Sequence, residues 1–353
     1  MKVAWVLASL SLAACAYDAT GIPAEDDPPL VEPAPPPPPR EEGQTTPPKP
    51  VLRRCVGRTF TPDPKEKWRH WGSNVVTLGR ARHAGHDEIV AEGSPVVIKG
   101  KFAYGSISKD LEDEKVRLFI DDCNGWKKVG DLITDSDGRA ELAVGVLPIG
   151  VYEVRFEVMG DQSQAPATLW ILPPGTHLAV FDIDGTLTTG DGEIIHEFFS
   201  DIFFDEYVPQ AYPSARELTQ AHADLGWIPV YLTGRPYWLS FHTRRWLADG
   251  DFALAPLRLT DSNGEALPTE SGVGAYKLAF LRGLTGAGFV IDFAYGNAST
   301  DIYAYLGAGI AAGSVWIIGK HAGEQGTNGV TETWAARTAQ VESLPPVEQP
   351  FQN

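Results

Sequence analysis

LAVFDIDGTLT, the stretch at residues 178–188, joins a run of apolar residues to two closely spaced acids. Its first four residues are continuously apolar, which is typical of a parallel strand covered on both faces. Asp182 and Asp184 follow at once and precede Gly185-Thr186, where the chain is expected to turn away. Both carboxylates should therefore lie at the carboxyl end of a strand, where α/β sheets bind ligands. Taken alone, the same residues would also suit a solvated Asp-Gly turn.

Two carboxylates at this spacing suit two different steps of phosphoryl transfer. Asp182 is placed to attack phosphorus, and Asp184 to protonate the leaving oxygen. Gly185 and Thr186, in the turn that follows, are further candidates for binding the substrate phosphate. The stretch therefore predicts a phosphate-handling site.

Two further elements downstream carry groups suited to phosphate. Thr233-Gly234-Arg235 ends the next apolar strand and offers a hydroxyl, an unobstructed backbone N–H and a forked cation. Lys277 is expected near the start of a helix, where its point charge would neutralise both phosphate and Asp182. Each also has a plainer explanation, a strand-to-helix turn for the first and a solvated surface lysine for the second.

The segment GNASTD, residues 296–301, follows another apolar strand and supplies hard oxygen ligands at Asn297 and Asp301. Mg²⁺ prefers such oxygens and keeps several waters. Asp182 and the backbone carbonyl of Asp184 would contribute two ligands, and Asn297 or Asp301 a third. The ion would offset repulsion between the anionic nucleophile and the phosphate. As an isolated string, the segment is simply a turn and a helix cap.

This order of motifs over residues 177–320 resembles the haloacid-dehalogenase superfamily. The family's Asp-x-Asp-Gly-Thr, Ser/Thr, Lys and acidic motifs correspond here to DIDGT, Thr233, Lys277 and GNASTD. The resemblance implies an α/β Rossmann-like domain. It also implies a two-step mechanism, in which Asp182 forms an aspartyl-phosphate and Asp184 acts first as acid and then as base. The short segments between the motifs leave room only for a small or absent cap.

Three segments narrow the resemblance to the lipin-type phosphatidate phosphatases: DIDGTLT at 182–188, TRRWL at 243–247 and GNASTDIYAY at 296–305. The resemblance implies phosphatidate or a related lipid phosphomonoester as substrate. Lipins carry Ser-Ala-Arg where this chain has Thr233-Gly234-Arg235, but the hydroxyl and the cation are kept.

Two alternatives to this substrate remain open. The first is a periplasmic phosphatase for soluble phosphomonoesters. The second is a lipid-binding module without turnover, because a similar domain ends the large phosphatidylinositol-transfer proteins. Retention of Asp182, Asp184 and Lys277 favours an active enzyme. The aromatic side chains of residues 194–208 would either flank an acyl chain or pack a core helix.

Residues 85–172 predict an all-β sandwich ahead of this domain. Short alternating runs at 96–102, 116–120, 140–144 and 151–158 are separated by turn sequences, a spacing typical of β-sandwiches. Within this region DSDG at 135–138 lacks the remaining ligands of an EF-hand and predicts a tight turn. The domain carries no catalytic motif, so we expect it to be a scaffold or a docking surface.

The N-terminal residues predict export. Residues 1–15 combine an early lysine, a short apolar stretch and small residues before Cys15, resembling a bacterial lipobox. An ordinary secretion signal is the alternative. Residues 16–50 are acidic and proline-rich, which favours an extended tether over a proline-rich ligand for a partner. Together these features predict a protein lipid-anchored to a bacterial membrane, the periplasmic face of the outer membrane in a Gram-negative cell.

The formal net charge of −17 argues against two kinds of partner, nucleic acid and anionic lipid, although local basic residues could still receive an anionic substrate. Nucleic-acid binders need basic faces, and electrostatic docking on anionic lipid uses Lys and Arg clusters. An oxidising compartment would permit a disulfide between Cys55 and Cys123, although buried free thiols are equally compatible with the sequence. Residues 51–84 are an uncertain connecting segment, and residues 321–353 are expected to form a C-terminal tail.

Overall fold

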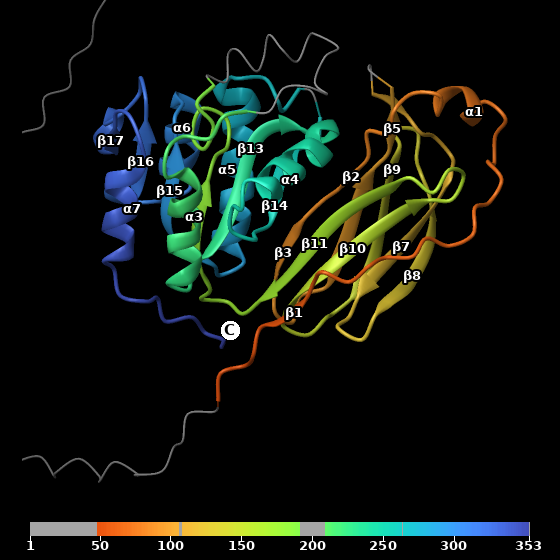
Figure 1. Ribbon diagram of the computed structural model, residues 1–353, viewed down its shortest axis with the longest axis horizontal. Helices are drawn as coiled ribbons and strands as arrows, with labels where there is room; N and C mark the ends of the chain where they lie inside the picture. Colours follow the sequence, from red (N-terminus) through yellow and green to blue (C-terminus); the bar gives the residue numbers. More distant parts are fainter. Residues whose placement is uncertain (1–47, 106–107, 191–208, 263, 353) are drawn as a thin grey trace, which may run out of the picture. The chain divides into compact units, whose positions relative to one another are not determined.

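The computed structural model describes residues 48–105, 108–190, 209–262 and 264–352. Within Pro48–Asn353, one compact unit, a mostly antiparallel β-sandwich precedes an α/β domain with one parallel sheet (Figure 1). Both domains of the predicted fold class, the β-sandwich and the α/β domain, are thus present. The predicted lipidation site Cys15, the tether up to residue 47 and the aromatic residues 194–208 lie outside the described residues. Residues 191–208 of the stretch between Asp184 and Thr233, where the small or absent cap was predicted, also lie outside them, so the cap stays a prediction.

The β-sandwich is built from two main sheets. The larger sheet has the order β3-β11-β10-β7-β8, with β1 parallel to β10. Its strands are β1 (Arg53–Cys55), β3 (Glu88–Ala91), β7 (Lys115–Asp121), β8 (Trp126–Ile133), β10 (Gly150–Val158) and β11 (Gln164–Leu172). The facing sheet contains β2 (Ala84–Gly85), β4 (Val96–Lys101) and β9 (Arg139–Gly145). A hairpin of β5 (Ala103–Tyr104) and β6 (Lys109–Asp110) and the one-turn helix α1 (Ser73–Val76) lie at one end.

The segment expected only as a connection is tied to the sandwich. β1 pairs with β10, and Cys55 forms a disulfide with Cys123, which follows β7. The Cys55 side chain is buried in the sandwich core. Residues 51–55 are therefore held both by backbone pairing and by a covalent link.

The α/β domain has a six-stranded parallel sheet in the order β14-β13-β12-β15-β16-β17. Its strands are β12 (His177–Phe181), β13 (Ile228–Pro236), β14 (Leu257–Thr260), β15 (Val290–Gly296), β16 (Val315–Ile318) and β17 (Asn328–Val330). Its helices are α3 (Ala215–Asp224), α4 (Ser240–Asp249), α5 (Ala275–Gly286), α6 (Ser299–Gly307) and α7 (Ala335–Glu342). Single helical turns lie at Tyr237–Leu239, Glu270–Gly274, Ala312–Ser314 and Glu324–Gly326.

The prediction that residues 321–353 form a C-terminal tail is wrong. β17 extends the sheet, and α7 contacts α3. Trp334 and Val341 are fully buried, so this segment contributes to the core.

Alternate residues of β12 face two different apolar cores, which explains its continuous apolar sequence. Leu178 and Val180 pack with residues of α5 and α6, whereas Ala179 and Phe181 pack with residues of α3 and α7. The first of these cores also includes Trp170 of the sandwich. The two domains therefore share an apolar contact.

A buried ion pair lies in the same contact between the domains. The Asp87 carboxylate accepts hydrogen bonds from Arg244 Nη1 at 3.0 Å and Nη2 at 2.9 Å. It also accepts from the backbone N–H groups of Leu257 at 2.7 Å and Thr168 at 2.5 Å. Because Arg244 and Leu257 belong to the α/β domain, Asp87 fastens that domain to the sandwich.

The two ends of the described chain meet. The backbone N–H of Leu52 donates to the carbonyl of Gln352 at 2.7 Å, and that of Gln352 donates to the carbonyl of Pro50 at 2.8 Å. Figure 1 shows this meeting point at the lower edge of the view, while the carboxyl end of β13 lies at the upper edge. Across the described ranges, no helix combines the length and apolar character needed to cross a membrane.

Candidate functional site

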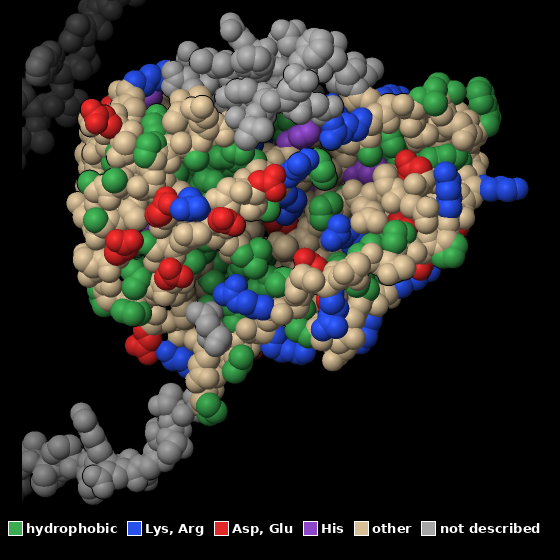
Figure 2. All heavy atoms as spheres, viewed as in Figure 1, with side chains coloured by type: hydrophobic (Ala, Val, Ile, Leu, Met, Phe, Trp, Pro, Cys, Tyr) green, Lys and Arg blue, Asp and Glu red, His purple; other side chains and the backbone are tan. Residues whose placement is uncertain are grey.

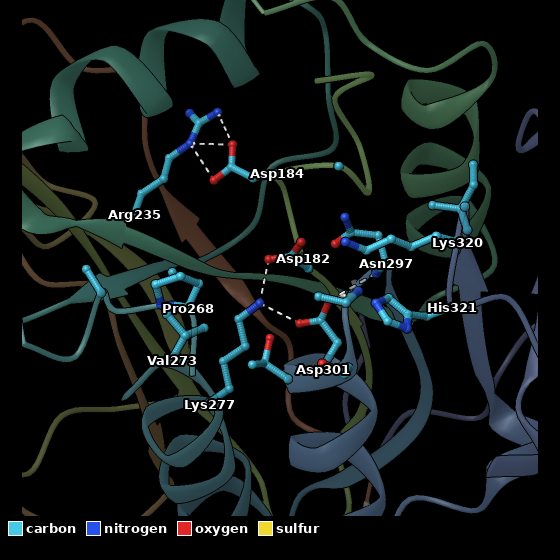
Figure 3. Close-up of a pocket in the computed structure, with 18 of the residues that line it drawn as sticks. Asp182, Asp184, Arg235, Pro268, Val273, Lys277, Asn297, Asp301, Lys320 and His321 are labelled. Carbon is cyan, nitrogen blue, oxygen red and sulfur yellow. Dashed lines mark hydrogen bonds and ion pairs between the residues drawn. The ribbon is translucent and has the colours of Figure 1, made fainter. Parts of the chain in front are cut away.

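The site lies where the strand order reverses direction. β12 pairs with β13 on one side and with β15 on the other, and all three run parallel. Such a switch point opens a crevice at the carboxyl ends of the strands. A cavity of about 220 Å³ is found there, and its lining includes both acids of the DIDGT segment (Figure 3). Lys277, Asn297, Asp301, Gly234 and Arg235 also line it.

Asp182 is buried at the floor of this cavity in a chain of charges. Lys277 Nζ donates to Asp182 Oδ1 at 2.5 Å and to Asp301 Oδ1 at 2.6 Å. Burial raises the pKa of Asp182 to about 7; the Lys277 charge opposes this rise, and the charges of Asp301 and Asp184 add to it. Burial lowers the pKa of Lys277, but Asp182 and Asp301 outweigh that effect and raise it overall. The lysine is therefore a permanent cation between two acids.

The second oxygen of Asp182 faces Asn297. Thr186 Oγ1 lies 2.9 Å from Asp182 Oδ2 and 3.3 Å from Asn297 Oδ1, so one buried hydroxyl brings these two acceptors together. Thr186 itself does not line the cavity. The structure thus places this candidate phosphate ligand behind the acid, where it orients Asp182.

Asp184 is held by Arg235. Arg235 Nε donates to both carboxylate oxygens at 3.0 Å, and Nη2 donates to Oδ1 at 2.6 Å. Thr233 Oγ1 donates to Asp184 Oδ2 at 3.2 Å, while Arg235 Nη1 donates to Thr243 Oγ1 at 3.0 Å. Both residues predicted to hold phosphate contact the second acid instead. Arg235 thus donates to both oxygens of Asp184.

Two glycines in the predicted motifs make close contacts that exclude a side chain. Gly185 has φ +72°, and a Cβ added there would lie 2.0 Å from Asn297 Nδ2. A Cβ at Gly234 would lie 2.8 Å from Val273 Cγ2. The glycine after Asp184 is therefore needed both for the turn and for the approach of Asn297.

The oxygens around Asp182 suit a hard cation with few protein ligands. Asp182 Oδ2 and Asn297 Oδ1 converge near Thr186. Asp301 is already engaged, through Lys277 at Oδ1 and through the backbone N–H groups of Asn297 and Ala298 at Oδ2. Among the described residues, no three His, Cys, Asp or Glu side chains gather in a metal-binding arrangement. An ion here would rely on water and substrate oxygens, as Mg²⁺ does.

Sequence reasoning missed several residues that line the cavity. Tyr212, Lys320 and His321 also border the cavity. Figure 3 shows Lys320 and His321 on the opposite side of the site from Arg235. They follow β16, so the rule that parallel strands end at one edge would have found them.

Comparison with known proteins identifies both domains. Residues 179–319 match the family described as PITM 1-3, LNS2 domain, and residues 81–171 match PITM 1-3, beta-sandwich domain. The chain contains a β-sandwich domain followed by an LNS2 domain. The LNS2 domain has a haloacid-dehalogenase-like fold, as the motif order predicted.

The curated relatives are much longer than this chain. Membrane-associated phosphatidylinositol transfer protein 3 of Homo sapiens is 30% identical over 292 residues, which are 80% of this chain and 28% of that protein. Membrane-associated phosphatidylinositol transfer protein 1 of Homo sapiens is 28% identical over 77% of this chain and 21% of its own length. Protein retinal degeneration B of Drosophila melanogaster is 28% identical over 73% of this chain and 20% of its own. The chain thus spans between a fifth and just over a quarter of these relatives.

One likeness to a solved structure is too weak to bear on this assignment. A chimeric titin tandem matches 26% of this chain and 50% of its own at 18% identity, but the TM-score of 0.20 is too low to bear on the fold.

These matches correct two predictions. The closest resemblance was predicted to be a lipin-type phosphatidate phosphatase in a bacterial lipoprotein, but both domains match those of PITM 1-3. The predicted localisation, exported and lipid-anchored at Cys15 to a bacterial membrane, is contradicted by the relatives, which are membrane-associated proteins of animals. The short motifs are shared across the superfamily and could not separate its members.

Proposed function

We propose that the LNS2 domain hydrolyses a lipid phosphomonoester, with phosphatidate as the lead substrate, in a Mg²⁺-dependent reaction. The observation that carries this proposal is the position of Asp182. Its carboxylate lies at the floor of the cavity, with Lys277 on one oxygen and Asn297 close to the other. The names of the relatives, which are phosphatidylinositol transfer proteins, support a lipid as the substrate.

The proposed reaction has two steps. An Asp182 oxygen forms a bond to phosphorus as the bond to the lipid oxygen breaks, and Asp184 gives its proton to the leaving alkoxide. Water then attacks the phosphorus of the aspartyl-phosphate while Asp184 takes a proton from that water. This step releases phosphate and restores Asp182. Mg²⁺ held by Asp182 and Asn297 would neutralise charge on the phosphate.

Arg235 links substrate binding to the role of Asp184. A guanidinium fork binds phosphate as well as it binds carboxylate. An arriving phosphate would therefore compete for Arg235 and free the Asp184 oxygens to carry a proton. In this account the pair seen between Arg235 and Asp184 is the resting arrangement.

A second candidate function is phosphate-lipid binding without turnover. The same ion pair favours it, because Arg235 occupies both oxygens of the proposed acid. The two functions differ in whether phosphate leaves the lipid.

The test measures phosphate release from phosphatidate in mixed micelles with Mg²⁺, with soluble phosphomonoesters in parallel. We expect phosphatidate to be the preferred substrate. We expect Asp182→Asn to lower the rate by roughly 10³-fold or more while the circular dichroism spectrum is unchanged, because the nucleophile is lost. Wild-type protein that binds phosphatidate without releasing phosphate would establish the second function. A preference for soluble substrates would remove lipid from the proposal.

A further inference from the structure

Three large apolar side chains around α1 are exposed within eight residues. Trp71 and Leu78 are each 84% exposed, and Val75 is 61% exposed. Single exposed apolar side chains are common on protein surfaces, whereas a group of them marks an interaction site. Figure 2 shows apolar side chains at the upper right, where Figure 1 places α1.

The backbone around these residues is fixed by a buried acid. Glu114 accepts hydrogen bonds from the backbone N–H groups of Arg69 at 2.9 Å and His70 at 3.0 Å, and from Ser73 Oγ at 2.5 Å. Trp68 points inward and packs against Gly160, at which an added Cβ would collide with its ring. Trp68 thus anchors the segment, whereas Trp71 is exposed to solvent.

The same segment is locally basic in an acidic protein. Residues 64–82 carry five Lys or Arg and a single acid, Glu66, although the whole chain has a formal net charge of −17. Glu66 is itself paired with Lys115 at 3.0 Å, and Arg69 is paired with Asp113 at 3.3 Å, so the basic character of the segment rests chiefly on Lys65 and Lys67. Lys65, Lys67 and His70 line a shallow hollow of about 620 Å³, together with Trp68 and Trp71.

The surface continues onto the LNS2 domain. The Arg80 guanidinium lies 5.9 Å from the centroid of the Phe241 ring, and Phe241 on α4 is 51% exposed. The turn before α4 begins two residues after Arg235, at Tyr237, whose hydroxyl is hydrogen-bonded to Ser108 Oγ of the sandwich at 2.8 Å. Arg80 therefore links the segment that carries α1 to the exposed Phe241 of the LNS2 domain.

We propose that this α1 surface, which comprises Lys65, Lys67, Trp71, Val75, Leu78, Arg80 and Phe241, docks the protein on an anionic lipid bilayer. Trp71, Val75 and Leu78 enter the boundary between headgroups and acyl chains, where tryptophan is favoured. Lys65 and Lys67 contact lipid phosphates, with each basic residue near the surface strengthening binding. The acidic remainder of the chain is repelled by the same bilayer, which orients the basic end toward it.

Cosedimentation with vesicles tests the docking. We expect the full chain to bind phosphatidylcholine vesicles that contain phosphatidylserine, to bind pure phosphatidylcholine more weakly, and to lose affinity as salt is added. The double variant Trp71→Ser/Leu78→Ser should bind roughly tenfold more weakly. Its control is Leu254→Ser, which removes a leucine that is 49% exposed and lies outside the α1 surface.

A second pair of variants tests the charge. Lys65→Ala/Lys67→Ala should weaken binding to phosphatidylserine vesicles and flatten its salt dependence. Lys127→Ala/Lys128→Ala removes two exposed lysines from β8 of the same domain and should change neither. Equal binding by the α1-surface variants and their controls would overturn the proposal. Wild-type protein that ignores vesicles but forms dimers abolished by Trp71→Ser/Leu78→Ser would assign the surface to self-association instead.

Docking and hydrolysis are separable. Phosphatidylserine is not a phosphomonoester, so docking on it needs no turnover, and Asp182→Asn should bind these vesicles as the wild type does. If the LNS2 domain proves catalytic, the α1-surface variants should lose activity on bilayer phosphatidate and keep it on a monomeric short-chain phosphatidate. Failure of the docking proposal therefore leaves the function of the site unaffected, and the reverse also holds.

Discussion

Two buried charged clusters in this protein differ in how completely their carboxylate oxygens are hydrogen-bonded. Asp87, between the domains, receives two hydrogen bonds on each oxygen, from donors in both domains. Asp182 has Lys277 on one oxygen and only the Thr186 hydroxyl on the other, beside an open cavity. Both acids are almost fully buried, so burial does not distinguish them. An incompletely bonded oxygen at a cavity is what marks a reactive group.

The cluster around Asp87, whose carboxylate oxygens are fully hydrogen-bonded, also supports the cluster at the cavity. Arg244, the partner of Asp87, follows Thr243, which accepts a hydrogen bond from Arg235. The sandwich thereby fixes the start of α4, which in turn fixes the arginine that holds Asp184. Asp87 thus helps to position Asp184, which is the proposed acid and base of the site.

Asp87→Ala is expected to have the largest effect on stability. The substitution removes the acceptor of the partly exposed Arg244 and of two backbone N–H groups, and breaking a pair of this kind costs up to about 3–5 kcal/mol when it is fully buried. Urea denaturation would measure the loss. Asp113→Ala is the control, because its pair with Arg69 is exposed on both sides and is worth about 1 kcal/mol or less. Equal losses in the two variants would show that the Asp87 pair contributes no more to stability than the exposed Asp113 pair.

His86, next to Asp87, predicts a pH effect confined to the domain contact. Burial lowers the pKa of His86 to about 4, Arg258 and Lys99 lower it further, and Asp261 and Asp87 oppose them. Between pH 6.5 and 4 the unfolded chain binds the proton and the folded chain does not, so stability falls as the pH falls. The limit is about 3 kcal/mol, reduced because the ring is partly exposed.

Comparison of the wild type with His86→Asn isolates this effect. The variant should lose less stability than the wild type when urea denaturation is repeated from pH 7 down to pH 4. Buried His83 and His222 also have lowered pKa values and remain in both proteins, so only the difference between the two curves reports on His86. Parallel curves would show that its ring does not titrate as inferred.

Gly185→Ala should lower stability by less than Asp87→Ala does, but it should also change the site. The positive φ costs about 1 kcal/mol for an alanine, and the added Cβ must also displace the Asn297 amide. We expect a loss of about 1–3 kcal/mol and a higher Mg²⁺ requirement in the phosphatase assay. Gly175→Ala is the control. Gly175 has φ +83° and open space around it, so this substitution adds backbone strain without a steric clash. A Mg²⁺ requirement unchanged in both variants would argue against Asn297 as a ligand.

Sequence patterns predicted the strands of the LNS2 domain because parallel strands covered on both faces are continuously apolar. They also predicted which residues would meet, since the carboxyl ends of β12, β13 and β15 share one edge. β17 was missed because it has only three residues, Asn328–Val330, without an apolar run. The pairing of Arg235 with Asp184 depends on side-chain directions that spacing does not specify. The family assignment needed both domains, since the motifs alone describe a superfamily.

The meeting of Pro50 and Leu52 with Gln352 has a consequence for how such a domain pair is carried in a longer protein. A chain that enters and leaves a folded unit at one place can be spliced into a host sequence as a cassette, with little stretching of either junction. In the view of Figure 1 this attachment point lies at the opposite edge from the carboxyl end of β13. The junctions with flanking sequence therefore lie away from the ends of the strands that form the cavity.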